Sequence, residues 1–163
     1  MHEIINKLPK LVKDKNKENK VFFNKQKKRP PKQLDYLMQD LHDNEFQSTD
    51  CLKCANCCKT TGPLFTDKDI RRISKYLKLK TKQFIENYLR LDEEDDYVLN
   101  TLPCVFLGED NFCSIYEVRP KACSEFPHTN RKKFYQITNL TLKNMTICPA
   151  AYNIVEALKK NVK

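Results

Sequence analysis

Eight cysteines are the residues of this 163-residue chain whose type and spacing can do chemistry. They are Cys51, Cys54, Cys57, Cys58, Cys104, Cys113, Cys123 and Cys148, and the first four share one octet. Thiolates are soft ligands that select zinc, copper(I) or iron–sulfur clusters, but cysteines also form disulfides or serve as buried structural thiols. The pattern therefore predicts a metal protein, a disulfide scaffold or a set of structural thiols.

The cellular compartment helps to choose among these classes. The chain opens without a sustained apolar segment after a basic start, and no segment approaches the roughly 18 apolar residues of a membrane span. We therefore expect a cytoplasmic protein with no membrane span. Thiols are kept reduced in the cytoplasm, so the clustered cysteines are expected to be metal ligands rather than disulfides.

The first cysteines follow the spacing C-x2-C-x2-C through Cys51, Cys54 and Cys57. This spacing lets one folded loop turn three sulfur atoms toward one centre, as in the cysteine runs of bacterial ferredoxins. Cys58 directly follows Cys57, and adjacent side chains project in different directions. We expect Cys57 and Cys58 to serve two different metals or two corners of one polynuclear cluster.

The later cysteines are expected on a hairpin and at two helix starts. A turn about Glu109 and Asp110 would place Cys104 opposite Ile115 and Cys113 opposite Phe106. The two cysteines would then form a diagonal pair with Cα atoms about 7–8 Å apart, a separation that suits a shared metal better than a disulfide.

The two remaining cysteines are expected near positive helix ends, which lower the pKa of a thiol. Cys123 follows Pro120, and Cys148 precedes Pro149 at an N-cap position. Eight thiolates divide into two four-coordinate sites, either zinc or iron, including iron held in a 4Fe-4S cluster. His128 can replace a thiolate but is more simply a supporting or surface group.

These ligands need elements to position them. Residues 1–33 carry a net charge of +8 and read as a basic, flexible or weakly helical extension, which either is solvated or binds nucleic acid or anionic lipid. Residues 34–50 predict a short helix and linker, with an apolar stripe that packs on the main domain. Residues 51–163 are expected to form the metal-binding domain.

Within that domain, helices are expected after Thr66, from Thr81, around 120–124 and from Pro149, and β-leaning residues occupy 134–142. The expected fold class is α+β. It is a small single domain in which short helices and a β-hairpin or small sheet surround a cysteine-rich metal centre.

An ordered set of motifs carries a resemblance to a known family. The motifs are Cys51-x-x-Cys54-x-x-Cys57-Cys58, Pro103-Cys104, Cys113 to Cys123 with Arg119-Pro120, Phe126-Pro127 and Cys148-Pro149. They resemble the CxxCxxCC, or YkgJ-like, family of zinc- or iron-chelating domains. The resemblance covers residues 51–149 and implies that all eight cysteines belong to the metal-binding set. Ala150 stands where family members often have glycine.

Three functions remain open. The first is metal binding with a structural or electron-transferring role. The second is an iron–sulfur-dependent enzyme, redox or protein-modifying, because the family resemblance extends to flagellin lysine methylase; Arg119, Tyr116 and His128 would then line a substrate pocket. The third is a zinc-stabilised nucleic-acid-binding module, which only the basic tail supports.

Overall fold

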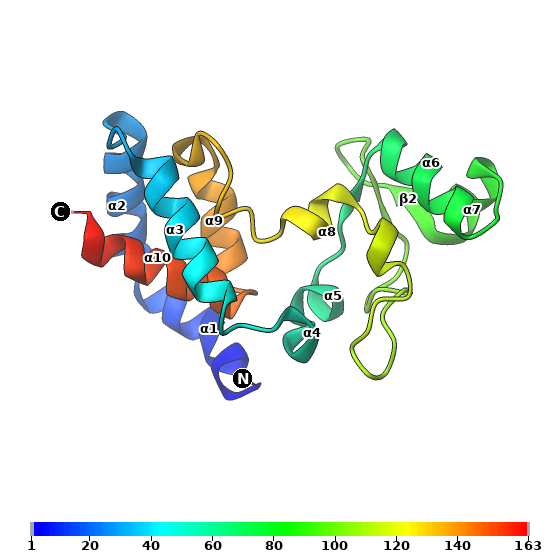
Figure 1. Cartoon of the computed structure of the whole chain (residues 1–163), viewed down its shortest axis with the longest axis horizontal. Coiled ribbons are helices and arrows are strands. Elements are labelled where there is room, and N and C mark those ends of the chain that lie inside the picture. Colours follow the sequence, from blue (N-terminus) through cyan, green and yellow to red (C-terminus); the bar gives the residue numbers. More distant parts are fainter. Residues whose placement is uncertain (1, 163) are drawn as a thin grey trace. The chain divides into compact units, whose positions relative to one another are not determined.

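The structure is a computed structural model that describes residues 2–162, and the chain divides into two compact units. Unit 1 comprises residues 1–54 and 127–163, and unit 2 comprises residues 55–126. Each unit has its own apolar core. The fold class is α+β, as the sequence predicted, because unit 1 is helical and unit 2 combines short helices with a small antiparallel sheet (Figure 1). The division differs from the expected single domain over residues 51–163.

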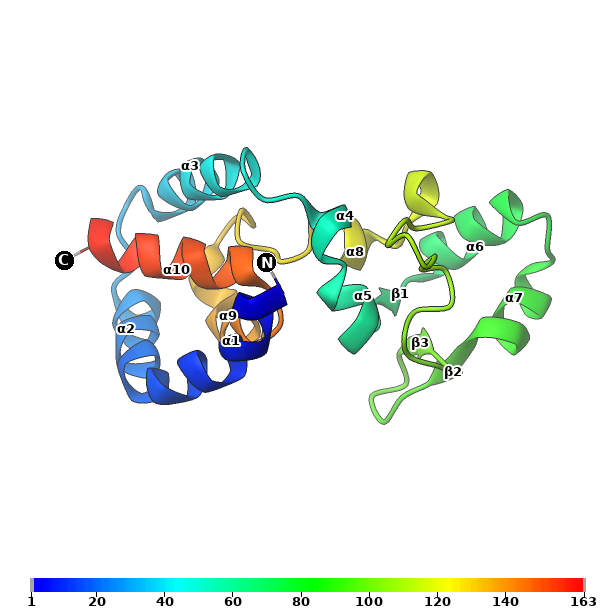
Figure 2. The same cartoon turned by 90° about the horizontal axis from the view of Figure 1, so that it is seen from below.

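Unit 1 is organised around its C-terminal helix. Its elements are α1 (His2–Asp14), α2 (Asn16–Lys28), α3 (Leu34–Phe46), α4 (Cys51–Cys54), η2 (Phe134–Ile137), α9 (Thr138–Met145) and α10 (Pro149–Asn161). Figure 2 shows α10 between α3 and α1, and α10 contacts both of these helices and α9. Ile154, Val155 and Leu158 of α10 are fully buried, as their helical spacing predicted.

The N-terminal segment differs from the expected flexible or weakly helical extension. Residues 2–28 form α1 and α2, two helices of 13 residues each, and they contribute Val12 and Phe23 to the core of unit 1. The lysine-rich composition did not predict this packing, because a few apolar side chains on one face are enough to anchor a helix whose other residues are solvated. The helix predicted after residue 33 is confirmed as α3, and its stripe of Leu34 and Met38 is buried in the same core.

The segment over residues 134–142 is helical, and the β-strand tendency predicted for it is wrong. It forms η2 and then α9, with Phe134 and Met145 fully buried. Packing against α10 outweighs the weak intrinsic preference of β-branched residues. In the described part of the chain, no helix has both the length and the apolar character needed to cross a membrane.

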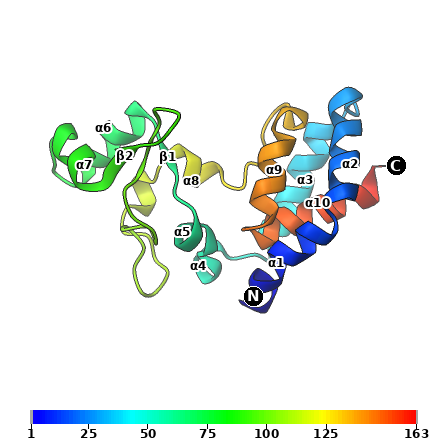
Figure 3. The ribbon, with the colours of Figure 1, turned by 180° about the vertical axis from the view of Figure 1, so that it is seen from behind.

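Unit 2 is built on three very short strands and several short helices, of which α6 and α7 are the longest. Its elements are α5 (Asn56–Thr60), β1 (Leu64–Phe65), α6 (Asp67–Tyr76), α7 (Thr81–Tyr88), β2 (Leu89–Leu91), β3 (Tyr97–Leu99), η1 (Tyr116–Val118) and α8 (Lys121–Glu125). The sheet is antiparallel with the order β1-β3-β2, and Val98 of β3 pairs with both Leu64 and Arg90. Figure 3 shows the α6–α7 pair beside β2, where α7 contacts the strand.

The helix starts in unit 2 follow the capping signals of the sequence. Thr66 caps α6, because its hydroxyl accepts from the Asp69 backbone N–H at 3.2 Å while the Asp69 carboxylate accepts from the Thr66 N–H at 3.0 Å. Thr81 is the first residue of α7, and Lys80 takes the cap position. Ile73 and Phe84 are fully buried, so the predicted apolar faces of both helices form the core of unit 2.

Candidate metal centre

The cysteine octet folds into two single helical turns. Cys51 and Cys54 lie at the two ends of α4, and Cys57 and Cys58 lie in α5. Ala55 separates the turns with a left-handed φ of 48°, which stops α4 from continuing into α5. The octet therefore contributes two thiols to unit 1 and two to unit 2.

Cys57 and Cys58 have neighbouring sulfur atoms. The two Sγ atoms are 3.9 Å apart. Two sulfur atoms on one tetrahedral zinc lie about 3.8 Å apart, given a Zn–S bond of about 2.3 Å. The distance alone does not separate the two residues, so their assignment to different metals or different corners stays a prediction from chain geometry.

Four cysteines of unit 2 come from three segments that fold against one another. Cys58 lies in α5, Cys104 and Cys113 lie on the two sides of a tight loop, and Cys123 lies in α8. The Cys104 backbone N–H donates to the Cys58 carbonyl at 2.8 Å, which ties α5 to the loop. The Cys123 N–H donates to the Pro120 carbonyl at 2.9 Å within the first turn of α8.

The loop that carries Cys104 and Cys113 has a different register from the one predicted. Cys113 pairs with Leu107 rather than with Phe106, and the Ser114 N–H donates to the Phe106 carbonyl at 2.8 Å. The turn is closed by the Gly108 N–H, which donates to the Phe112 carbonyl at 2.8 Å. The register shifts by one residue because this turn centres on Asp110, and the side chain of Asp110 also accepts from the Phe112 N–H at 2.9 Å.

The thiols of unit 2 influence one another electrostatically. Burial is the main reason that the pKa of Cys104 and Cys113 is raised, and the neighbouring Cys58 raises both further. Burial, followed by the charges of Cys58, Cys104 and Cys113, raises the pKa of Cys123 to about 12. The cation of Arg119 acts in the opposite direction on Cys113 and Cys123. The thiolate forms of these cysteines would therefore repel one another, and a bound cation would relieve that repulsion.

Cys58 behaves differently from its neighbours. A hydrogen bond from Cys57 lowers its pKa to about 7, with a smaller contribution from Lys59. Cys58 is therefore more acidic than Cys104, Cys113, Cys123 and Cys148, and it is the natural first thiolate of the set.

Unit 1 holds a second set of thiols. The Cys148 Sγ caps α10 by accepting from the Ala151 backbone N–H at 3.4 Å, as its position before Pro149 predicted. The expected acidity of Cys148 and Cys123 is wrong for the side chains as they stand. Burial, together with the charges of Cys51 and Cys54, raises the pKa of Cys148 to about 12, so desolvation outweighs the helix end.

The chemistry of the donor set fits zinc or iron. All eight cysteines carry free thiols; Cys51 is exposed and the others are partly buried. As the side chains stand, residues 2–162 contain no group of three or more His, Cys, Asp or Glu side chains that could hold a metal ion. Chelation would therefore require the thiols to turn toward a common point, and the eight-ligand assignment stays a prediction.

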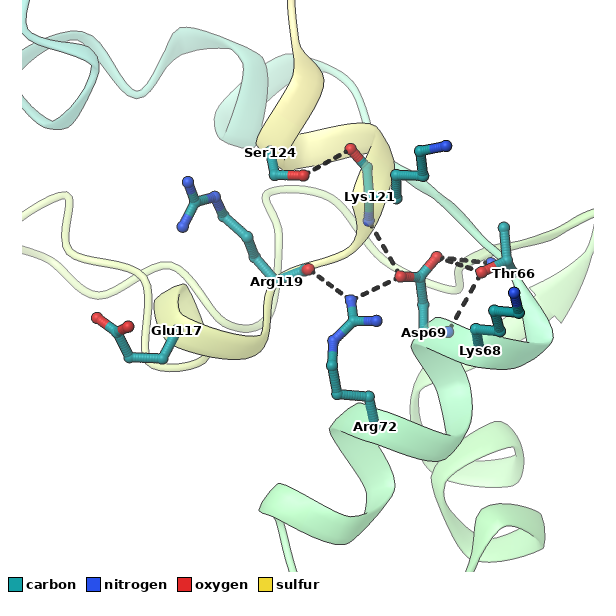
Figure 4. A pocket seen from close by; sticks show the side chains of 8 residues that line it. All are labelled: Thr66, Lys68, Asp69, Arg72, Glu117, Arg119, Lys121 and Ser124. Carbon is teal, nitrogen blue, oxygen red and sulfur yellow. Dashed lines mark hydrogen bonds and ion pairs between the residues drawn. The ribbon is translucent and has the colours of Figure 1, made fainter.

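Unit 2 has an open pocket of about 390 Å³ beside α8, the helix that carries Cys123. It is lined by Thr66, Lys68, Asp69, Arg72, Glu117, Arg119, Lys121 and Ser124. Asp69 lies at its floor with a side chain only 1% exposed, and accepts from Arg72 Nη2 at 2.6 Å and from the Lys121 N–H at 3.0 Å (Figure 4). Burial opposes the charged form, but hydrogen bonds from Thr66, Arg72 and Lys121 outweigh it and lower the pKa of Asp69.

Of the three residues predicted to line a substrate pocket, Arg119 and Tyr116 lie together in unit 2. Arg119 lines the pocket and stacks on the Tyr116 ring, with its guanidinium carbon 3.9 Å from the ring centroid. His128 lies in unit 1 and does not line this pocket. Sequence reasoning missed Asp69 as the residue that joins α6 to α8. Its capping signal was visible, but the partner 52 residues away was not.

The comparisons with known proteins establish the family. Residues 50–146 match the model of the CxxCxxCC family, described as "Putative zinc- or iron-chelating domain", so the chain belongs to this family. Cys148 lies just beyond the matched segment. An uncharacterized protein of Methanocaldococcus jannaschii, MJ0661, is 33% identical over 82 residues, which cover 48% of this chain and 44% of the relative. The chain thus spans less than half of that relative's length. No solved structure matches.

Proposed function

We propose that this protein binds zinc or iron through cysteine thiolates, with one four-thiolate centre in unit 2 made by Cys58, Cys104, Cys113 and Cys123. The observation that carries this proposal is the meeting of three segments, α5, the loop around Gly108 and α8, each of which brings thiols into the same charged neighbourhood. Four cysteines are the usual ligand set of structural zinc sites and of iron–sulfur clusters.

The remaining cysteines are proposed as ligands of a second centre. Cys51, Cys54 and Cys148 belong to unit 1, where the charges of the first two act on the third. Cys57 belongs to unit 2, and the C-x2-C-x2-C spacing alone supports it as a further metal ligand. All eight cysteines are thus proposed metal ligands.

The residues around the unit 2 thiols fit a centre that carries negative charge. Arg119 is held by a hydrogen bond from its Nη1 to the Tyr116 carbonyl at 2.8 Å and by the Tyr116 ring, and its charge favours the thiolates of Cys113 and Cys123. A bound zinc ion would supply a structural cross-link, and an iron centre would add electron transfer. The cysteine thiolates would bind the metal, and the cation of Arg119 offsets part of the thiolates' negative charge.

The test is anaerobic purification followed by metal and inorganic sulfide analysis of the wild type and of matched variants. Cys58→Ser and Cys123→Ser should each remove the unit 2 centre and leave the metal bound by the other set. Cys51→Ser and Cys148→Ser should do the reverse, and the double variant Cys123→Ser/Cys148→Ser should remove both. Ser124→Ala, next to Cys123, is the control and should retain full metal. Full metal content in Cys123→Ser would contradict the unit 2 centre.

An iron–sulfur-dependent enzyme is the second candidate. The observation that favours it is the open pocket whose lining residues Arg119 and Ser124 flank the α8 segment of Cys123. A brown protein with inorganic sulfide would support this candidate, whereas a colourless protein that contains only zinc would favour a structural role.

A further inference from the structure

The pocket of unit 2 is lined by more cations than acids. Lys68, Arg72, Arg119 and Lys121 line the pocket, together with two acids, Asp69 and Glu117. Asp69 is buried and already bound to Arg72 and the Lys121 N–H, so its charge is largely neutralised within the protein. The surface around the pocket therefore presents cations to solvent.

Helix α6 extends this basic surface by one turn. Its buried side chains are Asp69, Ile70, Ile73 and Ser74. Lys68, Arg71, Arg72 and Lys75 occupy the opposite side at helical spacings of three and four residues, and all four are exposed. Asp67, Glu117 and Glu125, which pairs with Lys121, are the exposed acids near these cations. Four cations on one face of a ten-residue helix, with two more across the pocket, form an electrostatic footprint for a polyanion.

The cations do not converge on one point. Figure 4 shows Arg119 and Lys121 pointing to different sides of the pocket, with Arg72 between α6 and the Arg119 backbone, where its Nη2 donates to the Arg119 carbonyl at 2.8 Å. A single compact anion could contact only some of them. An extended chain of negative charges fits this distribution better.

Two aromatic rings neighbour Arg119, which lines the pocket. Phe112 is 53% exposed, and its ring centroid lies 6.2 Å from that of Tyr116. The guanidinium carbon of Arg119 lies 3.9 Å from the centroid of the Tyr116 ring, and Arg119 also lines the pocket. Phe112, Tyr116 and Arg119 thus form a ladder of three neighbouring planar groups, with the two rings tilted by 32°, that leads from the pocket lining to an exposed aromatic side chain. Bases of single-stranded nucleic acids stack on such rings and guanidinium planes while basic side chains follow the phosphates.

We propose that the face of unit 2 formed by α6, η1, α8 and Phe112 binds single-stranded nucleic acid. The phosphates lie along Lys68, Lys75 and Lys121, and a base stacks on Phe112. Duplexes keep their bases stacked internally, so they cannot use the ladder. None of these residues belongs to the basic N-terminal segment.

The test is fluorescence anisotropy of a labelled 12-nucleotide oligo(U) with the metal-loaded full chain at increasing salt. The triple variant Lys68→Gln/Lys75→Gln/Lys121→Gln should weaken binding at least about tenfold and make the log–log salt slope shallower by about 2, because each phosphate contact on a single strand contributes about 0.7. Lys82→Gln is the matched control, because Lys82, like Lys121, is exposed and paired with a glutamate four residues on. It should leave the affinity unchanged.

The stacking part has its own variants. Phe112→Ala should weaken binding about 5- to 150-fold, since one base stacked on an aromatic side chain contributes about 1–3 kcal/mol, and Phe112→Tyr should restore most of it. Val105→Ala, another change at a half-exposed apolar residue, should have no effect. Metal content and circular dichroism, measured on every variant, separate a lost surface from a lost fold.

Four results would overturn the proposal. Three of them are no binding by the wild type at 50 mM salt, equal affinity for duplex, and displacement of the oligonucleotide by polyglutamate at equal charge. The fourth is binding that survives the triple variant but is lost in Lys25→Gln/Lys27→Gln, a variant that changes two exposed lysines of α2.

Discussion

Unit 1 and unit 2 acquire their order in different ways. Four helices of unit 1, α1, α2, α3 and α10, are 13 residues long, and they supply most of a continuous apolar core. Unit 2 has strands of two or three residues, and its longest helix has ten. Long amphipathic helices bury enough surface to hold together, whereas small units with short elements need cross-links. The comparison suggests that the cysteines of unit 2 contribute to its folding and are more than an attached site.

Removing the metal should have the largest effect, and it should fall mainly on unit 2. In small zinc domains, metal binding supplies folding free energy of order 10 kcal/mol. After chelation, we expect amide protection to be lost across α6, α7 and the sheet, while α3 and α10 keep theirs. Hydrogen exchange followed by mass spectrometry measures both units in one sample. Equal loss of protection in the two units would contradict the prediction that the metal stabilises mainly unit 2.

Matched core truncations should show a smaller effect. Phe134 of unit 1 and Phe84 of unit 2 are both fully buried, so Phe134→Ala and Phe84→Ala should each cost about 3–5 kcal/mol in the unit concerned. Only Phe84→Ala is expected to weaken metal retention against a competing chelator at the unit 2 thiols. Phe134→Leu and Phe84→Leu are the controls, with losses of about 1 kcal/mol. Identical metal retention by the two alanine variants would mean that unit 2 does not couple folding to metal binding.

Asp69 gives the smallest predicted effect and a pH dependence. Its carboxylate joins the α6 cap to Arg72 and to the start of α8, so Asp69→Asn should destabilise unit 2 by about 2 kcal/mol at pH 7. The pKa of Asp69 is lowered by the fold, so its contribution is present above the ordinary value of 3.8 and is lost as the pH falls below it.

Urea unfolding between pH 7 and pH 3, with the metal state held fixed, measures this contribution. The wild type should lose stability below about pH 4 more steeply than the Asn variant. Parallel pH profiles for the two proteins would show that the Asp69 charge does not stabilise the unit. Lys82→Gln provides a surface change in the same unit and should shift neither profile by more than a few tenths of a kcal/mol.

Local signals predicted the helices well. The helical spacing of Leu34 and Met38 identified α3, Thr66 marked the start of α6, and Cys148-Pro149 marked the start of α10. Each signal depends on neighbours within one or two turns, which a single sequence displays. The strand tendency over residues 134–142 and the extension over residues 1–33 failed because burial against α10 and the rest of the core decided them.

Local sequence signals predicted only part of the candidate metal site. The cysteine types and the spacing C-x2-C-x2-C identified the kind of chemistry and the family. The predicted hairpin register was wrong by one residue because the register depends on which residue lies at the centre of the turn. The predicted lowering of the pKa of Cys123 and Cys148 was wrong because it considered the nearby helix end and not the burial of the two thiols.

The sequence by itself determined that cysteine thiols set the chemistry available to this protein and where its main helices begin, because residue type and short-range spacing carry that information. The tertiary structure alone decided that Cys58, Cys104, Cys113 and Cys123 share one neighbourhood, that Asp69 reaches α8, and that Arg119 lies between the thiols and a basic surface. These relations join residues up to 65 positions apart. Chain packing rather than local preference sets such distances.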